Sequence, residues 1–242
     1  MNANPYDPPN TPMESATDIV DRAQRDELAT VVRQFLDEDV TAFEFDERLD
    51  GFRNSPDSAV RFVAQAVWFH YDDCDDHLVA LAKPEWDYFQ RLLLLLESNR
   101  CVQTTSLRRW SLWQLIAFLS LLGFLWVAFH IGWGYHLLLA AVPFGIISIG
   151  ISWLRRTTTN VGPYDPIIFP FASFSDLKAT YDNVTFNKSR YPQHIKTRKI
   201  RSPFMNGVYQ FQFYVIWLML SPIALVIQVF PPAETHTRVI VA

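Results

Sequence analysis

The stretch that decides the fold runs from Trp110 to Leu154 and reads WSLWQLIAFLSLLGFLWVAFHIGWGYHLLLAAVPFGIISIGISWL. It contains no Asp, Glu, Lys or Arg. A soluble helix carries charged residues on its exposed face, whereas a helix that crosses a bilayer needs about 20 consecutive, mostly apolar residues. A tight, glycine-containing connection at 130–136 divides the stretch, which predicts two transmembrane helices, at 110–131 and 135–154.

A second uncharged stretch, from Ser202 to Ala233, predicts a third transmembrane helix at 207–230, ended by two prolines. The predicted fold class is all-α, with an N-terminal soluble helical domain followed by three transmembrane helices. The rest of the chain divides into a disordered tail at 1–16, an acidic helical domain at 17–98, a polar linker at 99–109, a basic cytosolic loop at 155–206 and an external tail at 231–242.

The segment 17–98 carries apolar residues at helical spacing. Leu28, Val31, Val32, Phe35 and Leu36 share one helix face, and similar patterns follow as far as residue 96. These patterns predict about four helices around one core. The leucine run at 92–96 is too short for a membrane span and is flanked by charged residues, so it is predicted to be a buried part of the last helix.

Lys and Arg near the ends of the apolar stretches predict how the chain is oriented. Positive residues near span ends stay in the cytoplasm. The seven orienting residues are Arg108, Arg109, Arg155, Arg156, Arg198, Lys199 and Arg201. With three crossings they all fall on one side. The prediction is a multi-pass protein of the bacterial cytoplasmic (inner) membrane, with a cytoplasmic N-terminus and an external C-terminus.

The net charge of −4 conceals two segments of opposite sign. Residues 1–100 carry 21 acidic against 9 basic residues, and residues 155–201 carry 9 basic against 3 acidic residues. An acidic N-terminal half argues against nucleic acid as a partner, because phosphates require a basic surface. The basic loop is predicted to lie mainly on anionic lipid and to contact the helical domain only weakly.

The most suggestive chemical pattern is HYDDCDDH at 70–77. On a helix, His70, Asp73, Cys74 and His77 would share one face, and His, Asp and Cys side chains all bind zinc. A straight helix cannot wrap four ligands around one ion, so another segment would have to complete the site. The alternative interpretation is a solvated acidic helix end. Cys74 and Cys101 are both expected to be reduced thiols in the cytoplasm.

Small residues mark one face of the second apolar stretch. Ala141, Gly145, Ser148 and Ser152 are spaced by three or four residues, which allows a neighbouring helix to approach closely. This face is predicted to pack against another span of the same chain or of a partner. The sequence contains no phosphate-binding glycine loop, nucleophile elbow or HExxH motif. No catalytic residue and no cofactor are assigned.

Three segments of the helical domain, TAFEFDERLD at 41–50, VWFHYDDCDDH at 67–77 and EWDYFQRLLLLL at 85–96, resemble stretches in an uncharacterised bacterial protein family. The resemblance covers residues 28–98 and implies a bacterial inner-membrane location, but no activity. The favoured function is a membrane-anchored interaction or regulatory protein that binds a protein partner through its acidic domain. The alternatives are a subunit of a transport or envelope-assembly complex and a metal-dependent enzyme or sensor.

Overall fold

The computed structural model describes residues 19–70, 76–108, 110–158, 164–200 and 202–241. It is mostly helical, as predicted. The elements, in chain order, are α1 Arg22–Leu36, α2 Ala42–Leu49, the 3₁₀ turn η1 Asp50–Phe52, α3 Ser58–Trp68, α4 Lys83–Glu97, β1 Arg100–Arg108, α5 Leu112–Ile131, α6 His136–Thr158, α7 Asp165–Ile168, α8 Phe174–Asp182, the 3₁₀ turn η2 Ile195–Thr197, α9 Pro203–Met219, α10 Ser221–Val229 and β2 Ala233–Val241.

These elements form two compact units, which we describe separately. The helical unit contains the described residues up to Gln103, together with Pro166–Arg198 and the chain from Arg238 onwards. The apolar unit contains the described residues of Thr104–Asp165 and Lys199–Thr237. The boundary between the two units falls inside both strands.

The helical unit is built on α1 to α4, three of which begin at a capping side chain. Asp21 caps α1, Asp57 caps α3, and Thr41 forms a reciprocal capping box at the start of α2. The apolar face of α1 packs against α2, α3 and α4. All five leucines at 92–96 are buried, because α4 is covered on more than one side.

Residues 166–198 complete the core of the helical unit. Phe171, Phe186 and Ile195 are buried in the same cluster as the side chains of α1 to α4, and α8 packs against α4. The prediction of a basic loop at 155–206 that lies on lipid is therefore wrong for this part. Its basic residues suggested a lipid-facing loop, but Phe171, Phe186 and Ile195 are buried in the core of the helical unit.

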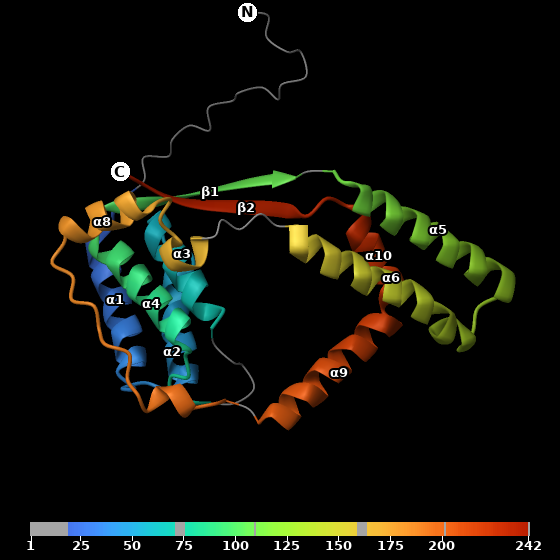
Figure 1. The fold of residues 1–242 in the computed structure, drawn as a ribbon, viewed down its shortest axis with the longest axis horizontal. Helices are drawn as coiled ribbons and strands as arrows, with labels where there is room; N and C mark the ends of the chain where they lie inside the picture. Colours follow the sequence, from blue (N-terminus) through green and yellow to red (C-terminus); the bar gives the residue numbers. More distant parts are fainter. Residues whose placement is uncertain (1–18, 71–75, 109, 159–163, 201, 242) are drawn as a thin grey trace, which may run out of the picture. The chain divides into compact units, whose positions relative to one another are not determined.

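The structure also differs from the predicted all-α class by one two-stranded sheet, in which β1 pairs with β2 (Figure 1). Both strands are rich in β-branched residues, which favour extended backbone. Most of the segment predicted as a linker at 99–109 is β1, and most of the segment predicted as an external tail at 231–242 is β2. Neither strand could be predicted from its own residues, because each is extended only by pairing along one edge with the other.

In the apolar unit, α5 and α6 are each long and apolar enough to cross a membrane. The predicted third span is not one straight helix. It consists of α9 and α10, which meet at an angle of 75°. Ser221 and Pro222 begin α10, and proline lacks the N–H that would continue the hydrogen-bond ladder of α9. The three predicted spans are therefore two single helices and one bent pair, which counts as a third span only if the pair is taken together.

The hydrogen bonds of the bent pair fix the direction of α10 relative to α6. Near the start of α10, the Ser221 hydroxyl donates to the carbonyl of Ala141, in the second turn of α6. Near the end of α10, Arg155 Nη2 donates to the carbonyl of Gln228 at 3.0 Å. Thus α10 runs beside α6 in the same direction and ends close to where α6 ends.

Candidate functional site

The helical unit has a groove where the start of α4 faces residues 188–196, a segment that we call the strap. Three hydrogen bonds hold the strap in place. Trp86 Nε1 donates to the Ser189 carbonyl at 3.2 Å, the Ser189 N–H donates to Gln90 Oε1 at 2.8 Å, and the Tyr191 hydroxyl donates to the Leu81 carbonyl at 2.9 Å. Buried Ile195 anchors the end of the strap in the core. The strap backbone is therefore fixed by the bundle.

The groove is strongly cationic. Its volume is about 630 Å³, and the residues that line it are Ala82, Lys83, Asp87, Lys188, Ser189, Arg190, Tyr191, Gln193 and Lys196. Four of these are cations and one is a carboxylate. We call this feature the cationic groove. It combines residues from two segments that are 100 positions apart in the sequence.

Asp87 is the only carboxylate among the lining residues, and it is already neutralised. Its two oxygens contact Lys83 Nζ at 2.6 Å and Lys188 Nζ at 2.7 Å. Burial pushes the pKa of Asp87 upwards, but the hydrogen bonds from Lys188 and Lys83 outweigh burial and leave the pKa below its ordinary value. Arg190 and Lys196 make no ion pair with any residue that the structure describes. The groove thus carries an excess of positive charge that the described chain does not balance.

The predicted metal cluster is only partly within the described residues, since Asp73 and Cys74 lie outside them. His70 packs between the rings of Tyr88 and Phe89, and its Nδ1 lies 4.0 Å from Glu85 Oε1. Burial lowers the pKa of His70, which Glu85 only partly opposes. Among the described residues, no group of three or more His, Cys, Asp or Glu side chains is placed to hold a metal ion.

His77 instead contacts the start of α2 through its backbone. Its carbonyl accepts the N–H of Ala42 at 2.8 Å, and the neighbouring Asp76 carboxylate accepts the N–H of Phe43. The His77 ring donates from Nδ1 to the Leu78 carbonyl. The described end of the 70–77 segment therefore caps a helix.

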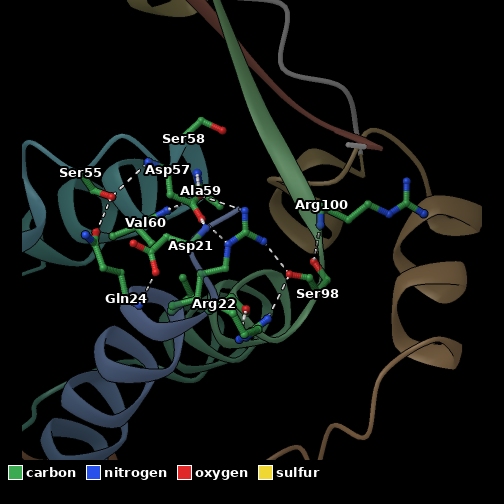
Figure 2. A network of polar contacts seen from close by, with 12 residues as sticks. Asp21, Arg22, Gln24, Ser55, Asp57, Ser58, Ala59, Val60, Ser98 and Arg100 are labelled. Carbon is green, nitrogen blue, oxygen red and sulfur yellow. Dashed lines mark hydrogen bonds and ion pairs between the residues drawn. The ribbon is translucent and has the colours of Figure 1, made fainter. Parts of the chain in front are cut away.

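A buried ion pair that the sequence analysis did not identify lies in the helical unit, where α1 and α3 begin and α4 ends; Figure 2 shows the polar contacts around Asp57. Both side chains are fully buried, with Arg25 Nε 2.6 Å from Asp57 Oδ2 and Arg25 Nη2 2.9 Å from Asp57 Oδ1. Arg25 Nη1 also donates to the Ser98 carbonyl at 2.6 Å. Solvent and ligands cannot reach this pair, so it serves the fold. The available signal was the position of Arg25 on the apolar face of α1, three residues before Leu28.

The four small residues of α6 lie against α9 and α10. A Cβ atom on Gly145 would meet Leu218 Cδ2 at 2.8 Å and Leu218 Cα at 2.9 Å. Ala141 accepts a hydrogen bond from Ser221. Ser148 and Ser152 contact the side-chain amide of Gln228, and Trp217 Nε1 donates to the Ser148 hydroxyl. The described polar groups of this interface bond to one another, which indicates helix packing.

The orienting residues have mixed surroundings. Arg198 belongs to the helical unit, where it bonds the Glu38 carboxylate and the Val79 carbonyl. Arg155 bonds the end of α10, and Arg108 is exposed near the end of β1. Lys199 is exposed and Arg156 lies in the last turn of α6. Arg109 and Arg201 lie outside the described residues.

No family model, curated protein or solved structure matches the chain. The resemblance of residues 28–98 to an uncharacterised bacterial family therefore stays a prediction.

Proposed function

We propose that this protein is a membrane-anchored interaction protein, in which the apolar unit is embedded in the bilayer and the helical unit binds a partner in the cytoplasm. The observation that carries the proposal is the opposite placement of apolar side chains in the two units. The helical unit buries them around α4, whereas the apolar unit exposes them, with Trp126 and Phe129 at 65% and 85% exposure. Exposed apolar patches of this extent require lipid or protein around them.

The topology that fits this proposal has both ends of the chain on one side. If α5 and α6 both cross the bilayer, the chain returns to its starting side at Arg155. The pairing of β1 with β2 then requires α10 to end on that same side. We infer that α9 and α10 enter and leave the bilayer from one face, so that β2 lies on the same side as β1. The exposed cations Arg108 and Lys199 fall on this side, which makes it cytoplasmic.

A role in binding fits the sites better than a transport pathway does. A pathway needs polar groups that remain available to a substrate. In the apolar unit, the Gln228 side-chain amide donates hydrogen bonds to Ser148 and Ser152, and the Ser221 hydroxyl donates one to the backbone of α6. By contrast, the cationic groove of the helical unit is open and carries unbalanced charge. We therefore assign binding to the groove.

The topology can be tested with reporters that are active on only one side of the membrane. A reporter fused after Ala242 and one fused before Met1 are both expected to report the cytoplasm, while a reporter inserted at Trp133, between α5 and α6, reports the outside. Carbonate washing is expected to leave the full chain in the membrane. A C-terminal reporter active outside, or release of the chain by carbonate, would overturn the membrane arrangement.

The binding role can be tested in cells with a photo-crosslinking residue at Gln193, which is exposed at the groove. The expected result is a discrete crosslinked product that disappears when Arg190 and Lys196 are both changed to Gln. The matched control places the same probe at Ser175, an exposed position on α8 outside the groove. Equal products from both positions, or a product that survives the groove substitutions, would contradict a binding site in the groove.

A further inference from the structure

We propose that the cationic groove binds a phosphate group, carried either by a lipid headgroup or by a soluble phosphate compound. The proposal deepens the proposed function, since it rests on the helical unit being the binding part of the protein and names the chemistry that it recognises. It is carried by the cavity, the four cations that line it and the fixed backbone of the strap.

The charge of the groove points to an anion. Lys83 and Lys188 share Asp87, so the pair and their carboxylate carry one net positive charge. Arg190 and Lys196 add two more, which no described residue offsets. Clustered like charges repel one another, and clefts lined by one sign of charge concentrate counter-ions. A ligand with one or two negative charges would reduce the repulsion among these cations. The occupied groove would still not be negatively charged.

The donor set favours phosphate among anions. Arg190 supplies a planar fork that can bind two oxygens at once, and Lys196 supplies a mobile point charge. The Ser189 hydroxyl and the Gln193 amide add neutral donors. A phosphate group offers three or more acceptor oxygens to such donors from several directions, whereas a carboxylate offers two in one plane. The cavity, at about 630 Å³, also leaves room for whatever carries the phosphate.

The groove is preorganised, which limits the entropy lost on binding. The two ends of the strap are tied to the bundle, by Ser189 at one end and by buried Ile195 at the other. Asp87 holds the amines of Lys83 and Lys188 at a fixed separation. Its carboxylate would repel an anion only where those two lysines do not screen it. Arg190 and Lys196 are therefore the cations that we expect to contact the ligand directly.

The test uses the purified full chain in nanodiscs. In the first arm, the discs contain only phosphatidylcholine, and inorganic pyrophosphate is titrated by calorimetry. In the second arm, hydrogen exchange of the strap is compared between discs of phosphatidylcholine and discs that also contain phosphatidylglycerol. The groove variant is Arg190→Gln with Lys196→Gln. The control variant, Lys178→Gln with Arg48→Gln, removes the same charge from exposed positions outside the groove.

We expect at least one arm to show binding that is weakened roughly tenfold or more in the groove variant and less than about twofold in the control, because charge-assisted bonds to phosphate are lost only in the former. Binding in the first arm identifies a soluble phosphate, and protection in the second arm alone identifies a lipid headgroup. No binding in either arm overturns the proposal. So does equal weakening in both variants, which would show only non-specific attraction to net positive charge.

Hydrogen exchange of α4 serves as the folding check, and it is expected to be unchanged in both variants. The outcomes separate this proposal from the proposed function. If phosphate fails to bind but the crosslink from Gln193 persists and depends on the groove, the binding role stands and the phosphate chemistry is wrong. If phosphate binds and the crosslink is absent, the groove is a ligand site and the role in protein interaction is wrong.

Discussion

Replacing Asp57 by Asn tests how the helical unit is held together. Asp57 accepts hydrogen bonds from Arg25 through both oxygens, and also from the N–H groups of Asp21 and Ala59 at 2.9 Å each. The carboxylate therefore neutralises a buried guanidinium, caps α3 and ties the start of α1 to the start of α3. Asn is itself a good cap, so the substitution removes the charge and leaves the cap largely intact.

The expected loss of stability follows from the burial of the pair. Both side chains have zero exposure, so Arg25 would be left without a counter-charge in a site that water does not reach. Removing one partner of a buried pair costs about 3–5 kcal/mol. At about 1.4 kcal/mol for each factor of ten, opening of the helical unit should become roughly 10²- to 10⁴-fold more frequent. The double variant Arg25→Met with Asp57→Asn should recover most of the loss, because no charge is then buried.

Hydrogen exchange of the full chain in detergent measures this effect directly, through the protection of backbone amides in α1 and α3. The control is Arg53→Met, which breaks a pair with Asp46 that is partly exposed to solvent, and which should cost less than about 1 kcal/mol. If Asp57→Asn changes protection no more than Arg53→Met does, or if the double variant is as unstable as the single one, the buried pair does not hold the unit together.

Three further outcomes are expected. Ile195→Ala should destabilise the helical unit by about 2–5 kcal/mol in a denaturant titration, since it empties a buried site; no change would mean that the strap is not packed on the bundle. Gly145→Leu should lower the melting temperature of the apolar unit in detergent, and Gly150→Leu should not, because a Cβ clashes only at the first position. The hydrogen bond from Arg198 lowers the pKa of Glu38. This ion pair therefore stabilises the fold fully at pH values above the ordinary pKa of 4.5, and its contribution disappears as the pH falls through the lowered pKa. Glu38→Gln should therefore be less stable than the parent at pH 7 and equally stable at strongly acidic pH; a constant difference across the pH range would contradict this assignment.

The features that sequence analysis anticipated are those that local pattern determines. The uncharged stretch beginning at Trp110 predicts apolar helices of spanning length, and the structure has them. The leucine run at 92–96 is buried in α4, as its length and its charged neighbours indicated. In both cases the signal lies within one helix, so no knowledge of distant contacts is required.

The features that sequence analysis did not anticipate depend on pairing between distant segments. The strand β1 looks like a polar linker until its partner, more than 120 residues later, is known. The cationic groove likewise exists only when Lys83 and Lys188 meet at Asp87. Proline at 222 could be recognised as a kink, but its effect, a turn of 75°, depends on how α10 packs against α5 and α6.

The pairing of β1 with β2 also sets the order in which the protein can be completed during synthesis. β1 leaves the ribosome before α5 has been made, and its partner β2 is synthesised only after α10. The core of the helical unit is likewise incomplete until Phe171, Phe186 and Ile195 have been synthesised, after α5 and α6. At about 5–20 residues per second, the early helices spend several seconds with an unfilled core while the membrane segments are inserted. During that interval β1 is an unpaired strand edge, which makes nascent chains that end before residue 233 especially vulnerable to aggregation and proteolysis.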